Sequence, residues 1–411
     1  MPVEPAALTE LSVYVHIPFC TSRCRYCDFY VETGASPGLI DRMLTRITEE
    51  ASWYSRRTGR PQIRTIYLGG GTPSVVAPAR LERFLRELAA SLAAEAVDEW
   101  TIEANPESLT GDFLAAAQAA GVGRLSLGVQ SFQDHLLERL GRRARRAAVD
   151  AALETVAREW RGRLTVDLIT GTPSQTWDDL ERDLQCIASA RPGHVSLYSL
   201  TVEPGTPLAR QIERGRVVPL DDEVQEQLWI AARDALQAQG YRWYEVSNFA
   251  LPGNESVHNP VYWRSEPYLG LGPGAVGTLP SGAPVRPVRV TNPQLPGYLE
   301  ADYELRRELE VIDDRTLLFE HFMLGLRTAA GIRLGRLEAV FGTDAESIST
   351  LLGRCEQLWS YVDRDLLARG RIALSPEGRL RANGLLVSLA GEIDRFTLPR
   401  RARWPAADRL R

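Results

Sequence analysis

Hydrophobic positions in the first half of the chain follow two alternating periodicities. Short apolar runs of strand length lie at residues 63–68, 99–103, 124–129, 164–169 and 194–200. Between these runs apolar residues recur at helical spacing, as in 39–55, 78–94 and 177–190. Strands that alternate with helices predict a parallel sheet with right-handed crossovers. This periodicity alone fits a barrel and a doubly wound sheet equally well.

The second half of the chain is mainly helical. Helical spacing recurs at residues 315–328, 334–341, 345–369 and 376–393, with a short strand-like run at 372–374. The proline-rich stretch 280–296 predicts a linker or an edge segment of the sheet. We therefore expect two domains, one over residues 1–290 and a smaller one over 291–411.

The composition is that of an ordinary globular chain. Of the 411 residues, 44% are hydrophobic and 25% are charged, both near the average for folded proteins. The net charge of −5 argues against a general surface for nucleic acid or anionic membranes, which needs a basic patch. No apolar run approaches the roughly 20 residues that span a bilayer, and the N-terminus lacks a signal-peptide pattern. We therefore expect a cytoplasmic, reducing setting with no membrane span and no nucleic-acid partner; peripheral membrane contact and a homodimer stay open.

A further apolar run at residues 13–17 predicts a first strand, which leads into a loop holding three of the five cysteines. Cys20, Cys24 and Cys27 have Cys-x3-Cys-x2-Cys spacing, which in a chain without a secretory pattern indicates a metal or iron–sulfur site. A structural zinc site and an ordinary ferredoxin cluster would each take four protein ligands. Three ligands on a four-iron cluster leave one iron open. The alternative is a zinc loop completed by His16 or a distant side chain.

The cysteine spacing resembles the cluster loop of the radical S-adenosylmethionine (SAM) enzymes. The flanking motifs, Tyr-x-His-Ile-Pro-Phe-Cys at 14–20 and Cys-Asp-Phe at 27–29, resemble the oxygen-independent coproporphyrinogen oxidase family and, within it, the HemW-like heme chaperone branch. The resemblance implies an α/β fold: a partial (β/α)6 TIM-like barrel, here residues 1–290, with a smaller, mainly helical, winged-helix-like C-terminal domain. It also implies that the three cysteines hold a 4Fe-4S cluster whose open iron is chelated by SAM.

The resemblance carries eight further residues over as SAM contacts. The glycine turn before Thr72-Pro73 lets a ligand approach the backbone closely. An arginine can clamp the SAM carboxylate, and a carboxylate can accept from ribose hydroxyls or the ammonium group. Considered alone, an arginine within the basic run 142–146 would be interpreted as a surface charge. An aspartate at a strand end would be interpreted as a carboxylate that accepts hydrogen bonds from its neighbours. The residues that match family positions are Tyr14, Gly70, Gly71, Thr72, Glu103, Gln130, Arg142 and Asp167. Ala144, where the family usually has histidine, departs from the pattern.

Two features distinguish branches of the family. Coproporphyrinogen oxidases of this type carry a further cysteine at the position of Phe29, so its absence counts against that activity. The His-Asn-x-x-Tyr-Trp motif at 258–263 resembles the HemW signature and implies heme binding through His258, Tyr262 and Trp263. Imidazole is a common axial ligand of heme iron, and aromatic rings can stack on a porphyrin. In the alternative interpretation His258 and Asn259 merely fasten a glycine-rich loop to the barrel; Val257, where arginine is usual, leaves that alternative open.

These observations lead to one main hypothesis and two rivals. The main hypothesis is a heme chaperone that binds a 4Fe-4S cluster, SAM and heme, and transfers heme to apo-hemoproteins. The first rival is a radical SAM oxidoreductase, coproporphyrinogen III dehydrogenase-like or acting on another porphyrin, which generates a 5′-deoxyadenosyl radical. The second is a zinc-stabilised interaction protein. Whether the protein is an enzyme stays open, and no catalytic residue is assigned.

Overall fold

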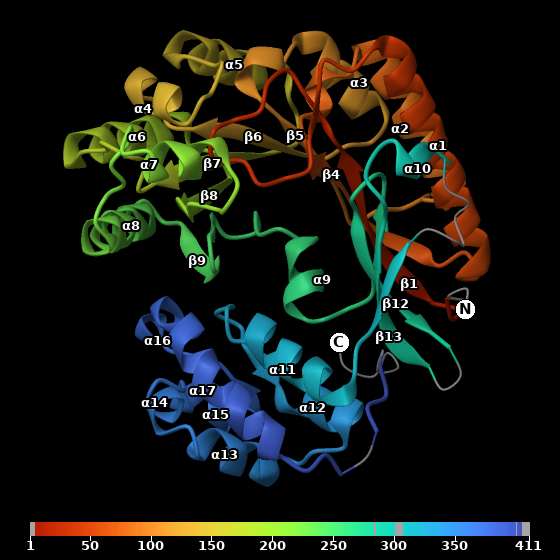
Figure 1. Cartoon of the computed structure of the whole chain (residues 1–411), viewed down its shortest axis with the longest axis vertical. Helices are drawn as coiled ribbons and strands as arrows, with labels where there is room; N and C mark the ends of the chain where they lie inside the picture. Colours follow the sequence, from red (N-terminus) through yellow and green to blue (C-terminus); the bar gives the residue numbers. More distant parts are fainter. Residues whose placement is uncertain (1–4, 283–284, 301–306, 400, 405–411) are drawn as a thin grey trace.

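The central element of the computed structural model is a twelve-stranded sheet in the order β14-β13-β12-β11-β1-β4-β5-β6-β7-β8-β10-β9. The structure describes residues 5–282, 285–300, 307–399 and 401–404. A parallel core comprises β11 (Tyr268–Leu271), β1 (Glu10–Ile17), β4 (Gln62–Gly70), β5 (Glu99–Ala104), β6 (Arg124–Gln130), β7 (Arg163–Thr170) and β8 (His194–Ser199). The sheet curves but ends in two free edges, so the predicted partial barrel of alternating strands and helices is confirmed (Figure 1).

Antiparallel strands extend both edges of the parallel core. On one side lie β12 (Val276–Ser281), β13 (Arg286–Thr291) and β14 (Glu308–Val311), and on the other lie β10 (Asn248–Ala250) and β9 (Arg242–Glu245). The proline-rich stretch 280–296 contains β13, which pairs with β12 on one side and with β14 on the other, so the prediction of a linker or an edge segment was wrong. Pro287 is tolerated because it lies outside the part of β13, residues 288–291, that pairs with β14.

Helices cover the outer face of the sheet (Figure 1). They are α1 (Pro37–Arg57), α2 (Pro78–Leu92), α3 (Gly111–Ala119), α5 (Arg146–Glu159), α6 (Trp177–Ala190) and α8 (Asp222–Ala238), with the shorter α4 (Asp134–Arg139), α7 (Pro207–Glu213) and α10 (Gly297–Glu300). Residue 177 starts α6 because Thr176 and Asp179 form a reciprocal capping box. Among the described residues, no helix is long and apolar enough to cross a bilayer.

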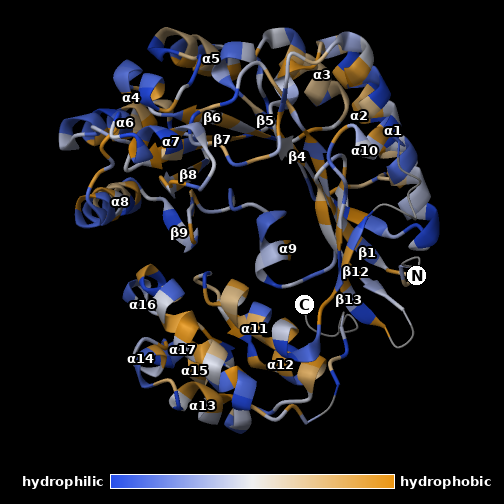
Figure 2. Cartoon of the chain, in the orientation of Figure 1, coloured by the Kyte–Doolittle hydropathy of each residue, from blue (hydrophilic) through white to orange (hydrophobic). Residues whose placement is uncertain are grey.

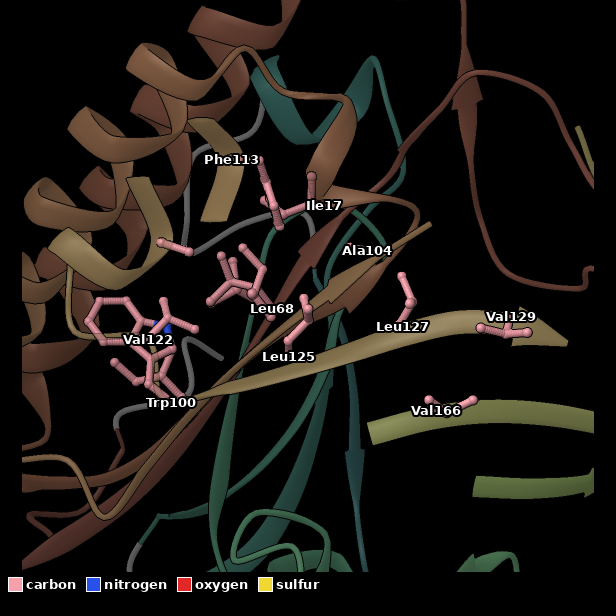
Figure 3. Packing of buried hydrophobic residues seen from close by; sticks show 14 of the residues in the cluster. Ile17, Leu68, Trp100, Ala104, Phe113, Val122, Leu125, Leu127, Val129 and Val166 are labelled. Atoms are coloured by element: carbon pink, nitrogen blue, oxygen red, sulfur yellow. The ribbon is translucent and has the colours of Figure 1, made fainter. Parts of the chain in front are cut away.

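The main hydrophobic core lies between the sheet and these helices. Figure 3 shows Leu68 from β4, Leu125 and Leu127 from β6 and Phe113 from α3, all members of this one cluster. Each is at most 1% exposed, and burying such a side chain contributes about 1.5–3 kcal/mol. Packing of this kind holds the strands in register, so that their carboxyl ends share one edge of the sheet.

The C-terminal part forms a helical body around its own hydrophobic cluster, which runs from Ile312 to Trp404. The cluster begins after β14, which still pairs with the large sheet; the predicted division at residue 290 stays a prediction. The elements are α11 (Asp314–Gly325), α12 (Leu334–Phe341), α13 (Ala345–Gly353), α14 (Glu356–Ser360), α15 (Arg364–Ala368), α16 (Pro376–Leu380) and α17 (Ala382–Arg395), with β15 (Ile332–Arg333) paired to β16 (Arg371–Ile372). Figure 2 shows hydrophobic residues along helices of this body such as α13 and α17, and the buried ones form this cluster.

Two long helices predicted in this body were wrong. The stretch 345–369 is broken into α13, α14 and α15, because Asp363 caps a new helix and Val362 bridges Leu374 instead of continuing the previous one. The stretch 376–393 is broken at Arg381 into α16 and α17. Helical periodicity persists through both breaks because the short helices face the same core.

A buried ion pair joins the strands to a distant segment. Arg124 on β6 donates to Glu99 on β5 at 2.8 Å, and the two side chains are 3% and 2% exposed. Arg124 also donates to the carbonyl oxygens of Asn254 and Glu255, both at 2.9 Å. The pair therefore connects the loop before residue 258 to the amino-terminal ends of β5 and β6.

We expect Arg124→Met to lower the free energy of unfolding by about 3–5 kcal/mol, because Glu99 would stay buried with only the longer, partly exposed pair to Arg163 at 3.8 Å. The matched control is Arg158→Met, which removes an exposed pair with Glu159 and should change stability by less than about 1 kcal/mol. Urea unfolding followed by circular dichroism measures both. Equal effects of the two substitutions would contradict the assigned role of the buried pair.

Candidate functional site: the cysteine loop and the strand ends

The cysteine loop leaves the sheet directly after β1. Cys20 ends the short strand β2 (Phe19–Cys20), which pairs in parallel with β3 (Glu32–Thr33) and so closes the base of the loop. Further along, the backbone N–H of Arg25 donates to the carbonyl of Leu140 at 2.9 Å. All three cysteines are free and half-buried. The loop is therefore anchored at its base and its middle, with its thiols available as ligands.

The glycine turn after β4 is shaped by this loop. The N–H groups of Gly71 and Thr72 donate to the carbonyls of Ile17 and Phe19, at 2.9 and 2.8 Å. A Cβ atom on Gly71 would lie 2.5 Å from the Ile17 oxygen, and one on Gly70, whose φ is +97°, would lie 2.2 Å from the ring of His16. Only glycine fits both positions without moving the loop.

Two polar side chains reach the thiols from other elements. The hydroxyl of Thr72 lies 3.4 Å from Cys20 Sγ, and Arg142 Nη1 donates to Cys24 Sγ at 3.6 Å. Burial raises the pKa of the Cys20 thiol to about 11 and also raises the pKa of Cys27. The thiolate forms therefore need positive charge, which iron ions supply when they bind.

The three thiols do not form a single-ion site. In the part of the chain that the structure describes, no three His, Cys, Asp or Glu side chains are arranged to hold one metal ion. His16, the suggested fourth zinc ligand, has both ring nitrogens occupied: Nε2 lies 3.0 Å from the carbonyl of Tyr30, and Nδ1 lies 3.0 Å from the Tyr14 hydroxyl. A four-iron cluster makes a different demand, because each cysteine binds a different iron.

Arg142 is buried rather than on the surface, at 6% exposure. Its Nη2 donates to the carbonyl of Gly128 at 2.6 Å and to Asn105 Oδ1 at 2.8 Å. The other end of the Asn105 amide donates to Thr72 at 2.9 Å. Arg142 Nε is buried and has no partner among the described residues, an orphaned donor that fits an anionic ligand group. The chain Thr72–Asn105–Arg142 thus connects the glycine turn to the cysteine loop.

Glu103 and Asp167 lie at the same edge of the sheet. Glu103 accepts from the Tyr67 hydroxyl at 2.7 Å and from the Gly70 N–H at 3.1 Å. Burial, with a smaller contribution from the charge of nearby Asp167, raises the pKa of Glu103 to about 7. Burial likewise raises the pKa of Asp167 to about 6, and the hydroxyl of Ser126 donates to its carboxylate at 3.2 Å. Two carboxylates that ionise near neutrality suit a cationic, hydroxyl-bearing ligand.

Gln130 adopts a positive φ of +69° at the end of β6. The pairing with β7 shifts register there, between Gly128 and Gln130, and such a bulge re-aims a side chain. Behind it, the buried Asp183 accepts from the Phe132 N–H at 2.9 Å and from the Ser131 hydroxyl at 2.8 Å. The structure thus brings all eight predicted SAM residues to one region; their individual roles stay predictions.

Sequence reasoning missed Asn105 and Tyr67. Asn105 immediately follows β5, and its position at a strand end could have indicated it. Tyr67 lies inside an apolar run, where only the alternation of β4 side chains places its ring inside the sheet's concave face.

The His258 motif consists of His258 and the short helix that it precedes, α9 (Asn259–Trp263), which lies between the sheet and the helical body and against α11 (Figure 1). His258 is 1% exposed. Its Nδ1 lies 2.7 Å from the Thr65 hydroxyl and its Nε2 lies 2.7 Å from the Tyr262 hydroxyl. Burial lowers the pKa of His258 to about 3, so the ring is neutral.

Glu99 fastens the same segment by accepting from the backbone N–H groups of Val257 and His258, at 2.9 and 3.0 Å. These hydrogen bonds are the ones expected if His258 only fastens its loop to the barrel. Tyr262 and Trp263, by contrast, are half-buried and reach solvent. Heme contact stays a prediction for all three aromatic residues of the motif.

A row of aromatic rings joins the two regions. Tyr67 stacks on Tyr14, with ring centroids 6.2 Å apart, and on His258, at 5.2 Å. His258 in turn contacts Tyr262 edge to face at 5.1 Å. Because Tyr67 also donates to Glu103, the predicted SAM residues and α9 share one packed unit.

Comparison with known proteins places this geometry in a family. The Radical SAM superfamily model matches residues 14–187. The chain is 35% identical to the heme chaperone HemW of Lactococcus lactis, covering 89% of this chain and 94% of that one, and 35% identical to HemW of Mycobacterium tuberculosis, covering 95% and 98%. It is 34% identical to the mitochondrial radical SAM domain-containing protein 1 of mouse, covering 94% and 84%.

The solved structure of coproporphyrinogen III oxidase (HemN) from Escherichia coli has the same fold, with a TM-score of 0.74 at 21% identity over 97% of this chain and 92% of that one. The superfamily match implies a 4Fe-4S cluster and SAM. The chain therefore belongs to the HemW family of the radical SAM superfamily.

Proposed function

We propose that this protein is a heme chaperone, which holds a 4Fe-4S cluster and SAM at the strand ends, binds heme beside α9 and transfers it to apo-hemoproteins. The observation that supports this proposal best is the series of hydrogen bonds Thr72–Asn105–Arg142–Cys24, which connects the cysteine loop to the glycine turn. The polypeptide that contains it covers 94% and 98% of two HemW heme chaperones.

The residues divide the work of ligand binding. Cys20, Cys24 and Cys27 would hold the cluster, which would supply an iron that SAM can chelate and a centre that can exchange an electron. Arg142 orients the SAM carboxylate through its free Nε. Glu103 accepts from the ammonium group, and Asp167 accepts from the ribose hydroxyls. Tyr14 lies beside the adenine, and Gly70, Gly71, Thr72 and Gln130 complete the binding surface.

Heme contact involves α9. Tyr262 and Trp263 present half-buried aromatic surface for a porphyrin. His258 becomes an axial ligand once its Nε2 leaves the Tyr262 hydroxyl, with Thr65 holding Nδ1 and thereby the ring orientation. Opening one hydrogen bond is therefore part of heme uptake.

Reductive cleavage of SAM is the second candidate function, because Glu103, Asp167 and Arg142 retain a complete polar setting for SAM. An anaerobic assay for 5′-deoxyadenosine in the presence of coproporphyrinogen distinguishes the two. Turnover of that substrate would replace the chaperone proposal with an oxidoreductase.

Cys24→Ser should prevent assembly of the cluster, because a serine hydroxyl does not ionise to replace a soft thiolate ligand of iron. After anaerobic reconstitution we expect the variant to lose visible absorbance and almost all bound iron and sulfide. Cys186→Ser, on α6, is the matched control and should assemble a full cluster. A cluster retained by Cys24→Ser would remove that residue from the ligand set.

SAM affinity should increase about tenfold between pH 6 and pH 8, because the pKa of Glu103 near 7 leaves its carboxyl mostly protonated at the lower pH and mostly ionised at the higher. Glu103→Gln should bind more weakly at pH 8 and lose this increase. Anaerobic calorimetry measures the SAM affinity of both proteins. The ratio of the two affinities at each pH cancels the effect of titration of SAM itself. A ratio that is constant with pH would contradict the assignment of Glu103.

His258→Ala should weaken heme binding by about tenfold or more and shift the Soret band, as expected when an axial ligand is lost. Tyr262→Phe is the informative partner variant, because it frees Nε2 while keeping the ring. We expect Tyr262→Phe to keep the Soret position and bind heme at least as tightly. If His258→Ala titrates like the unmodified protein, His258 only fastens the loop.

A further inference from the structure

Eight arginines lie on three segments that meet at the cysteine loop. We call this group the arginine collar and define it as Arg23, Arg25, Arg139, Arg143, Arg145, Arg210, Arg214 and Arg216. Arg25 is half-buried and the other seven are exposed. They come from the cysteine loop itself, from the turn after α4, and from α7 with the turn that follows it. We propose that the collar is the docking site for a small acidic electron-carrier protein that reduces the cluster.

Hydrogen bonds hold the three segments together. Arg25 Nη1 donates to the carbonyl of Glu138 at 2.9 Å, and the Arg25 N–H bonds to Leu140. The Arg25 carbonyl in turn accepts from the N–H of Leu208 at 2.8 Å. Gly141 packs so closely on Arg25 that an added Cβ would lie 2.7 Å from its Cγ. The collar is therefore one continuous surface, at the edge of the sheet where Figure 1 shows α4 and α7.

The charges of the collar are not neutralised. Several other arginines of the chain pair with carboxylates, as Arg80 pairs with Asp41 and Arg146 with Asp150. Within the described residues, none of the eight collar arginines forms an ion pair with a carboxylate within 4.0 Å. Their side-chain bonds go to backbone carbonyls, for example from Arg23 to Cys27 and from Arg145 to Arg142. Backbone carbonyls orient a guanidinium without cancelling its charge.

The excess of positive charge is local. Segments 21–29, 138–145 and 203–216 hold these eight arginines, with Arg142 buried beneath them, against four carboxylates, Asp28, Glu138, Glu203 and Glu213. The whole chain carries a net charge of −5. An acidic partner is therefore attracted to this surface and repelled by much of the rest, which raises the rate of encounter at one place.

The position of the collar decides which acidic partner it fits. Arg23 and Arg25 flank Cys24, and the half-buried Cys24 and Cys27 bring the proposed cluster close to the surface. Phe29, two residues beyond Cys27, is 65% exposed and offers one apolar contact. Electron-transfer encounters use small interfaces of this kind. Binding of a nucleic acid or a lipid surface does not require a site close to the cluster. The net negative charge of the rest of the chain would also repel both of these anionic partners.

The step itself is an outer-sphere transfer. The reduced centre of the carrier loses one electron, the oxidised cluster gains it, and no bond forms or breaks. The electron-transfer step rests on the proposed function, because it requires the cluster. The docking surface does not, because it consists only of side chains of this chain.

The test uses charge reversals at two exposed arginines that are not among the proposed ligand residues, Arg143→Glu with Arg214→Glu. The matched control is Arg369→Glu, an exposed arginine at the end of α15 in the helical body. The probe is a plant-type 2Fe–2S ferredoxin with an acidic surface, labelled for fluorescence anisotropy. Binding is measured with the full chain, both reconstituted and cluster-free, at several salt concentrations. Thermal unfolding verifies that all variants fold alike.

We expect the double reversal to weaken ferredoxin binding by about tenfold or more at low salt and to flatten its salt dependence. Reduction of the cluster by reduced ferredoxin should slow to a similar extent, while reduction by dithionite stays unchanged. Arg369→Glu should behave as the unmodified protein, and Arg143→Lys with Arg214→Lys should retain binding.

Equal effects of the collar and control reversals would overturn the proposal. It would also be overturned if vesicles of phosphatidylglycerol and phosphatidylcholine bound the unmodified protein but not the double variant, while ferredoxin binding stayed the same in both. If reconstitution produced no cluster, the proposed function would fail, yet binding to the cluster-free protein would still decide the collar separately.

Discussion

The buried guanidinium of Arg142 is the interaction on which the arrangement at the strand ends depends. A charge at 6% exposure is strongly destabilising unless its surroundings compensate it. The carbonyl of Gly128, the amide of Asn105 and the thiol of Cys24 do so together, each from a different element, and the Glu107 carboxylate lies 3.9 Å from the same guanidinium. The same contacts that satisfy this cation therefore fix the cysteine loop relative to the sheet. One nitrogen, Nε, remains for a ligand.

A second buried charge organises the opposite end of the barrel interior. Glu99 pairs with Arg124 and accepts from the backbone at His258. The His258 ring then stacks on Tyr67, whose hydroxyl bonds to Glu103. The proposed heme segment and the proposed SAM residues are thus built on neighbouring positions of the same two strands, β4 and β5. This proximity gives a physical route by which occupancy of one region can alter the other.

Local patterns were good predictors wherever the cause of a structure is local. The prediction of a helix at 177–190 was confirmed residue for residue, because a capping box starts it. The prediction of unbroken helices at 345–369 and 376–393 was wrong, because their breaks follow from a cap at Asp363 and from cross-chain contacts that periodicity does not record. Arg142 illustrates the same limit: within a basic run it has the pattern of a surface charge, and only Asn105 and Gly128, distant in sequence, show that it is buried.

The sequence by itself determined the alternation of strands and helices, the trio of cysteines and the glycine turn, since spacing and residue type suffice for each. Tertiary structure alone decided which side chains meet. In the folded chain both ring nitrogens of His16 and of His258 have hydrogen-bond partners, and Asn105 lies between Thr72 and Arg142. Arginines from three segments lie near Cys24. The physical reason is that parallel strands deliver their ends to one edge whatever their separation along the chain, so partners of a buried charge are neighbours in the sheet and not in the sequence.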